Sequence, residues 1–205
     1  MSAKNMMPML AGVGLLSLCC ISSSIAATTM GGGGEETPGA GAGAGAGAAT
    51  PSLPKGRYVR LEHTVAYDAN AAGNDDDKHK IINLAELEVF AKGSTTSLSA
   101  GKTVEAANFH PAGPLANLTD GNFSNFAHTL GRDVNEIDKM TVDLGSEKEI
   151  EKIKITNRVD CCKQRAQGIK AVILAADGTT LVKETPAIST TADTYTFTFP
   201  GTAWA

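Results

Sequence analysis

The chain is short of cysteine, aromatic side chains and excess charge of either sign. Of its 205 residues, four are cysteine, 5% are aromatic with a single tryptophan, and the formal net charge is −4. This mild acidity argues against a nucleic-acid partner, which needs a basic protein face against its phosphates. The mean hydropathy of −0.07 excludes a polytopic membrane protein, although not one N-terminal span. No HExxH, GxSxG or paired-acid signature is visible, so we expect a protein that is not an enzyme.

The N-terminal residues 1–30 carry a single charged side chain, Lys4. Met9 to Ala27 are apolar or small, and these 19 residues would reach roughly 28 Å as a helix, close to one bilayer core. Ser24-Ile25-Ala26 also fits a signal-peptide cleavage site. Residues 1–30 are therefore predicted to be a helical signal peptide or membrane anchor. A signal peptide and a membrane anchor would each place the rest of the chain on the non-cytoplasmic side, because the lone positive charge precedes the apolar run.

Residues 31–54 are nearly all Gly, Ala, Pro, Thr and Ser. A segment of this composition buries nothing, so we expect a disordered, flexible linker that spans roughly 25–30 Å root-mean-square. Residues 55–205 remain, and about 150 residues are enough for one domain with a full core. The sequence thus predicts a single domain, either secreted or anchored to a membrane through its N-terminal segment.

The domain sequence alternates apolar and polar side chains, as half-buried β-strands do. The residues Asn83–Phe90 (NLAELEVF) include several helix formers, yet Glu86 and Glu88 alternate with Leu87 and Val89, which favours a strand. About eight short strands predict an all-β protein, an antiparallel β-sandwich or jelly roll. The other expected strands are 58–67, 140–144, 150–156 and 194–199, together with 169–175 and 180–183, a hairpin around Asp177-Gly178.

Cys161 and Cys162 are the only cysteines outside residues 1–30. On an oxidising route, adjacent cysteines can pair with each other, pair with another chain, or stay free as buried thiols. Arg158 and Arg165 flank them, and the rigid fork of arginine donors suits the ring and hydroxyl oxygens of a sugar. A solvated surface charge is the alternative for either arginine taken alone.

Three motifs stand out in the domain sequence: Asp120-Gly121-Asn122, Val142-Asp143-Leu144-Gly145, and Ile153–Asp160 followed by Cys161-Cys162. Together they resemble the F5/8 type C (discoidin) family over about residues 57–200. Within that family, the pattern NRxDCCxxR at 157–165 is similar to the fucolectin branch, whose members bind L-fucose. The resemblance implies a galactose-binding-domain-like β-sandwich.

The order of the segments departs from that family. Fucolectins carry a GRYV…EFEVY segment at the C-terminal end of the domain, whereas here GRYV (56–59) and AELEVF (85–90) stand at its start. We therefore expect a circularly permuted domain, which is permissible because domain termini often lie close together. Residues 57–67 and 81–91 are expected to be core strands beside the C-terminal strand.

The resemblance implies a sugar site at His128, Arg158 and Arg165, over a Cys161–Cys162 disulfide whose flat sulfur face lies beneath the sugar. Asp160 is expected to position an arginine rather than to touch the ligand. We also expect the heads of both arginines to be exposed. A partly exposed structural histidine is the alternative for His128.

The resemblance further implies one structural calcium ion. Calcium takes six to eight oxygen ligands, and the implied donors are Asn117, Asp120 and Asn122 of the loop NLTDGN, with Glu86 and the Ala85 carbonyl from another segment. The alternative is a turn without an ion, because Asn, Asp and Gly dominate turns for their own reasons.

The expected function is a fucose-binding lectin with fucosylated glycans as partners. The alternative is a discoidin-type adhesion module that grips protein or lipid through its loop tips, for which Phe109, Phe123 and Phe126 are candidates. Because a single sugar site is weak, avidity would come from several copies, as a homo-oligomer or as a dense coat. The membrane is expected to contact the chain only through residues 1–30. This apolar leader and its Gly-rich tether resemble those of surface proteins of large DNA viruses.

Overall fold

The computed structural model describes residues 52–65, 80–130 and 137–205. The expected leader, nearly all of the expected linker and the end of the 58–67 strand lie outside the described residues. Residues 48–205 form one compact unit. Among the described residues, no helix has the length and apolar character that a membrane span requires.

The described chain contains nine strands and two single-turn 3-10 helices, and no α-helix. The 3-10 helices are η1 (Leu115–Leu118) and η2 (Lys163–Ala166). The strands are β1 (Lys55–His63), β2 (Asn83–Phe90), β3 (Val104–Glu105), β4 (Ala127–His128), β5 (Lys139–Glu149), β6 (Lys152–Asn157), β7 (Ile169–Leu174), β8 (Leu181–Glu184) and β9 (Thr194–Thr198).

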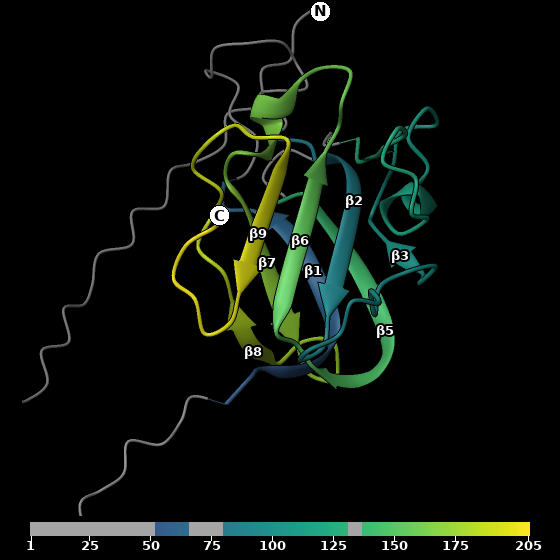
Figure 1. Ribbon diagram of the computed structural model, residues 1–205. Coiled ribbons are helices and arrows are strands. Elements are labelled where there is room, and N and C mark those ends of the chain that lie inside the picture. The colour runs from purple at the N-terminus through teal and green to yellow at the C-terminus, as the bar shows by residue number, and fades with distance from the viewer. Residues whose placement is uncertain (1–51, 66–79, 131–136) are drawn as a thin grey trace, which may run out of the picture. The chain divides into compact units, whose positions relative to one another are not determined.

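The strands form two antiparallel sheets. One has the order β3-β5-β1-β7-β8 and the other β4-β2-β6-β9. In Figure 1, β9, β6 and β2 lie in front of β7, β1 and β5, as expected for two packed layers. The predicted all-β antiparallel sandwich is confirmed, and so is the 169–183 hairpin, in which β7 pairs with β8.

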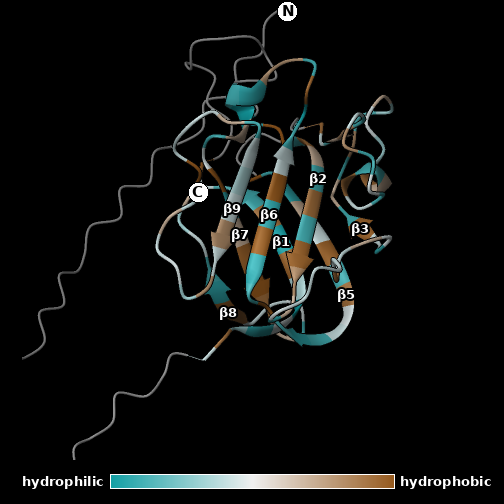
Figure 2. Cartoon of the chain, in the orientation of Figure 1, coloured by the Kyte–Doolittle hydropathy of each residue, from teal (hydrophilic) through white to brown (hydrophobic). Residues whose placement is uncertain are grey.

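The core lies between the sheets because each strand turns its apolar set inward. In β6, Ile153 and Ile155 are fully buried in the core, whereas Lys152, Lys154 and Thr156 face outward. Figure 2 shows this alternation as brown and teal bands along the strand. The alternation of apolar and polar residues that predicted the strands therefore matches the alternation of buried and outward-facing side chains in the structure.

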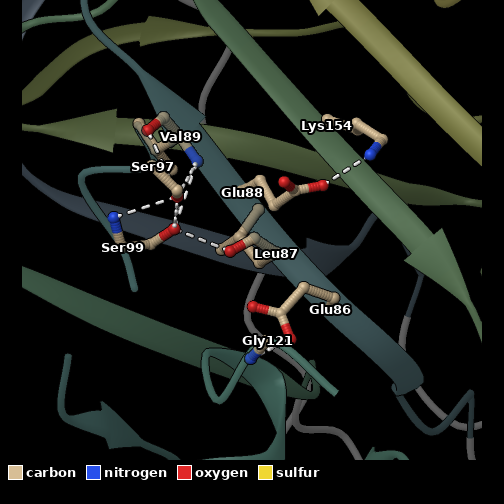
Figure 3. A network of polar contacts seen from close by, with 8 residues as sticks. All are labelled: Glu86, Leu87, Glu88, Val89, Ser97, Ser99, Gly121 and Lys154. Carbon is tan, nitrogen blue, oxygen red and sulfur yellow. Dashed lines mark hydrogen bonds and ion pairs between the residues drawn. The ribbon is translucent and has the colours of Figure 1, made fainter. Parts of the chain in front are cut away.

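The segment NLAELEVF forms β2, as its alternation predicted, although several of its residues favour helices. It pairs with β6 along most of its length, and Leu87 and Val89 lie in the core. The hydroxyl groups of Ser97 and Ser99 accept hydrogen bonds from the Val89 N–H, and Ser99 donates to the Leu87 carbonyl (Figure 3). Burial and these backbone partners together outweigh the helical propensity.

The first two strands lie inside the sheets. β1 pairs with β5 and β7, and β2 pairs with β4 and β6. Both are core strands, as expected from the permuted order. Their expected position beside the C-terminal strand is wrong, because β9 pairs with β6. β1 also ends at His63, earlier than the predicted 67, because a bend at Thr64 and Val65 follows it.

Candidate functional site

His128 and Arg158 lie at the same end of the four-stranded sheet, on either side of β2. Leu84 of β2 is a core residue that pairs with Ala127 of β4 and with Asn157 of β6. Side chains alternate along a strand, so His128 and Arg158, each one residue further on, point to the outer face. The register therefore brings two of the sequence-predicted sugar ligands together from positions thirty residues apart.

The Arg158 guanidinium is held in place by a carboxylate and an aromatic ring. Its Nε and Nη2 donate to Asp160 Oδ1 and Oδ2 at 2.7 and 2.6 Å, and its Cζ lies 3.7 Å from the centre of the Phe126 ring. The hydrogen bonds from Arg158 lower the pKa of Asp160 to about 2, so the carboxylate stays ionised at neutral pH. Such a bidentate pair fixes the plane of the guanidinium.

The expectation that both arginine heads are exposed is wrong. Arg158 is 8% exposed and Arg165 is 9% exposed. Arg158 is covered because its guanidinium lies over Phe126 rather than extending into solvent. Arg165 is covered because it belongs to η2, which follows the cysteine pair. The last two residues of η2, Arg165 and Ala166, are buried.

His128 is buried, and its ring is hydrogen-bonded to the backbone. Nδ1 lies 2.5 Å from the Thr129 carbonyl oxygen, which only accepts, so Nδ1 donates this hydrogen bond. Its ring centre lies 6.1 Å from that of Phe126 and 5.2 Å from that of His110. The sugar-binding role expected of His128 stays a prediction.

Cys161 and Cys162 form a disulfide with a Cα–Cα distance of 3.8 Å. Cys161 is exposed and Cys162 half-buried, so the bond reaches the surface. Cys162 has a φ of 61°, in the left-handed region that non-glycine residues rarely adopt. The backbone N–H of Arg165 donates to the Cys162 carbonyl at 3.1 Å. This bond begins η2 directly after the cysteine pair, and strained residues of this kind cluster at functional sites.

The expected calcium donors come together from β2 and the loop 117–125. The Glu86 carboxylate accepts from the Gly121 N–H at 3.1 Å, as Figure 3 shows. Asp120 accepts from the Asn122 N–H at 2.8 Å and from the Asn125 amide at 2.7 Å. Segments 35 residues apart therefore meet where Glu86 contacts the loop.

The residues present fit a bound cation. Burial, together with the charges of Asp120 and Glu88, raises the pKa of Glu86 to about 7, although the Gly121 N–H and Lys154 act in the opposite direction. A nearby divalent cation would offset the free-energy cost of ionising the buried Glu86 carboxylate. Ala85 lies at a register shift between Leu84 and Glu86, and a bulged residue is left out of the ladder, so its carbonyl can serve a ligand.

Most of the donors expected for calcium are amide and carbonyl oxygens. The described residues contain no group of three or more His, Cys, Asp or Glu side chains arranged to hold a metal. The expected set has only two carboxylates, Glu86 and Asp120. Asn117 donates through Nδ2 to the Phe126 carbonyl at 2.9 Å, so its Oδ1 is the atom with coordinating chemistry.

Comparison with known protein families supports the general class of this domain. Residues 117–204 match the model of a NedA-like, galactose-binding domain. The chain resembles a carbohydrate-binding module over that range. The match contains the disulfide and both arginines, whereas Ala85 and Glu86 precede it in β2. No curated protein and no solved structure matched the chain.

Sequence reasoning missed three residues of this region. Phe126 was named only as a candidate for the alternative adhesive loop tips, but its ring lies beneath Arg158 and near His128. His110 showed no pairing pattern in sequence, and only the fold brings its ring to His128. Asn83 was not predicted as a site residue, because an alternating strand is expected to have a polar residue between two apolar ones such as Ile82 and Leu84. Its position beside His128 depends on strand register.

Proposed function

We propose that this domain is a lectin that binds terminal fucose on glycans, without catalysis. One observation carries the proposal: Arg158, clamped by Asp160 and lying over Phe126, is placed across β2 from His128, and the Cys161–Cys162 disulfide follows directly in the chain. These groups would supply the hydrogen-bonding side chains and the flat sulfur surface that suit a deoxy-sugar.

Each group has a distinct role toward the sugar. Asp160 takes two of the five N–H groups of Arg158, which leaves donors for hydroxyl and ring oxygens. The His128 ring and the Arg165 guanidinium would supply further hydrogen bonds to the sugar hydroxyls. The exposed sulfur of Cys161 offers an apolar surface for the C6 methyl group of fucose. Galactose carries a hydroxyl at C6, which would lose hydration against that surface without a partner.

We propose a structural calcium ion held by Asp120, Asn117, Asn122, Glu86 and the Ala85 carbonyl. When bound, the ion supplies positive charge that joins the loop to β2. Glu86 would then be ionised although buried. Because Asn117 also holds the Phe126 backbone, an ordered loop would keep the Phe126 ring beneath Arg158.

The proposed setting is extracellular, either secreted or anchored through residues 1–30. Several copies, as a homo-oligomer or on one surface, would give the avidity that a shallow monosaccharide site lacks.

The deciding experiment is a glycan array probed with residues 48–205 in calcium-containing buffer, followed by calorimetry with methyl α-L-fucoside. This unit is preferable to 55–205 because Leu53 packs against the core and the Pro54 carbonyl accepts from Ile150. We expect selective binding to fucosylated glycans, and weaker binding by a Cys161→Ala/Cys162→Ala variant. An array on which no fucosylated glycan binds would refute the lectin proposal in its fucose form.

A second candidate is adhesion to protein or lipid without a sugar, which two exposed aromatic side chains favour. Phe109 is 47% exposed and Phe123 is 42% exposed. Sedimentation with phosphatidylserine vesicles tests this candidate. Binding that disappears in a Phe109→Ala/Phe123→Ala variant would support it, whereas no sedimentation of the wild type would exclude a lipid surface of this kind.

A further inference from the structure

Asn83 lies between the two best-placed ligands of the proposed sugar site. It is directly opposite His128 in the β2–β4 pair, and because Leu84 pairs with Asn157, it is opposite Arg158 on the β6 side. Ile82 and Leu84 on either side of it belong to the core, so the Asn83 side chain points to the outer face with His128 and Arg158. Neighbouring strands lie about 4.8 Å apart, so the three side chains form one row about 10 Å long.

The side-chain amide of Asn83 is buried without a partner. Asn83 is 1% exposed, and neither Oδ1 nor Nδ2 has a hydrogen-bond partner in the described part of the chain. Native proteins satisfy nearly all buried polar groups, so an amide with both ends unmet requires an explanation. A ligand that supplies the missing partners is one of the recognised explanations.

A nearby asparagine shows what a purely structural amide does in this fold. Asn157 is also 1% exposed. Its Nδ2 donates to the carbonyls of Lys163 and Ala192, and its Oδ1 accepts from the Arg158 N–H. Asn157 points inward and is fully used, whereas Asn83 points outward into the candidate site and is not. The two asparagines differ in their hydrogen bonding because Asn157 lies on the inner face of the sheet and Asn83 on its outer face.

The contact between Arg158 and Phe126 lies on the same side of β2 as the Asn83 side chain. Phe126 precedes β4 and Arg158 follows β6, so the two side chains meet across β2, at 3.7 Å from Cζ to the ring centre. For a ligand to reach the buried amide, the guanidinium would have to move off the ring.

We propose that Asn83 is a further ligand of the sugar site, an amide at its floor that binds two adjacent hydroxyl groups. This inference rests on the proposed function. A planar amide presents one acceptor and two donors side by side, and each sugar hydroxyl both donates and accepts, so vicinal hydroxyls complete both ends of Asn83. A ligand that lacks these hydroxyls would leave the buried amide without hydrogen-bond partners. The site would therefore discriminate strongly against such a ligand. Asn83 would therefore set specificity for the hydroxyl pattern.

The test is calorimetry of residues 48–205 with methyl α-L-fucoside and methyl β-D-galactoside, comparing wild type with Asn83→Leu. Leucine has a similar volume and no polar atom. We expect its affinity for the bound glycoside to fall at least tenfold, with a melting temperature equal to or above that of the wild type. Thr185→Val is the matched control, because it removes a buried polar group between β7 and β8, and its affinity should be unchanged.

A second measurement uses the wild type and does not depend on the folding of a variant. The side-chain NH2 resonances of Asn83 should shift on titration with the glycoside. Unchanged Asn83 signals, or wild-type affinity in Asn83→Leu, would overturn the assignment while leaving the lectin proposal intact; a trapped water would then be the partner of the amide. Shifts with the galactoside alone would support Asn83 and refute fucose. If neither glycoside binds, both proposals fail.

Discussion

Arg158 and Asp160 form a bidentate ion pair two residues apart, with N–O distances of 2.7 and 2.6 Å, beside a disulfide formed by the next two residues. The carboxylate is half in solvent, whereas the guanidinium is buried. Asp160 thus orients the arginine from the solvent side through two of its N–H groups. The pair therefore serves geometry more than stability, since partly exposed ion pairs contribute little to folding.

Asp160→Asn should weaken sugar binding with little effect on stability. The amide cannot accept both N–H groups as a carboxylate does, so Arg158 loses its fixed plane, and we expect roughly a tenfold lower affinity. The free energy of unfolding should change by less than about 0.5 kcal/mol. Calorimetry with methyl α-L-fucoside measures the affinity, and thermal unfolding measures the change in stability. Asp193→Asn, which breaks the exposed Lys163 pair, is the control and should bind normally.

Calcium should raise the melting temperature of the domain, because it binds the folded loop and not the unfolded chain. At a concentration of one hundred times Kd, the gain is about 2.7 kcal/mol. Glu86→Gln should remove most of this gain. Glu88→Gln is the matched control from the same strand, since Glu88 pairs with Lys154 rather than with the loop (Figure 3). Equal melting with calcium and with chelator in the wild type would remove the ion from the proposal.

Stability in saturating calcium should fall as the pH drops below about 6.5. Burial lowers the pKa of His63 from 6.5 to about 4, with Nε2 3.2 Å from the Ile81 carbonyl. The unfolded chain therefore takes up this proton first, so the contribution of His63 is complete above about pH 6.5 and is lost progressively down to about pH 4. The loss is on the order of 3 kcal/mol.

His63→Gln keeps a donor for the Ile81 carbonyl but does not titrate. Urea unfolding between pH 4 and 8 should therefore show a flatter profile in this variant. If both proteins lose stability with the same slope between pH 6.5 and 4, His63 is not the responsible group.

Gly56→Ala should destabilise the domain, because β1 is an interior strand at this position. A Cβ there would lie 2.6 Å from the Leu174 carbonyl oxygen and would also contact Ile173 Cγ2. The backbone must move to accommodate it, at a cost of about 1–3 kcal/mol. Lys55→Ala, at the exposed neighbouring residue, should have almost no effect. Chemical denaturation compares the two, and equal stability would contradict the central position of β1.

The amino-acid sequence alone determined the class of fold. The alternation along β2, β6 and β9 predicted strands correctly because burial on one face of a sheet has a period of two residues. The hairpin at Asp177-Gly178 followed from turn chemistry. Both are local properties that need no knowledge of neighbouring strands.

The tertiary structure alone decided which residues meet. β1 and β2 are interior strands rather than neighbours of β9, because pairing partners depend on the packing of the whole chain. Arg158 is buried because its guanidinium lies over the Phe126 ring, and Arg165 because of its place in η2. Asn83 joins His128 and Arg158 through strand register, which places residues far apart in sequence in one row. A one-residue shift of that register would have turned Asn83 into the core, and this is why alternation could predict the strand but not the site.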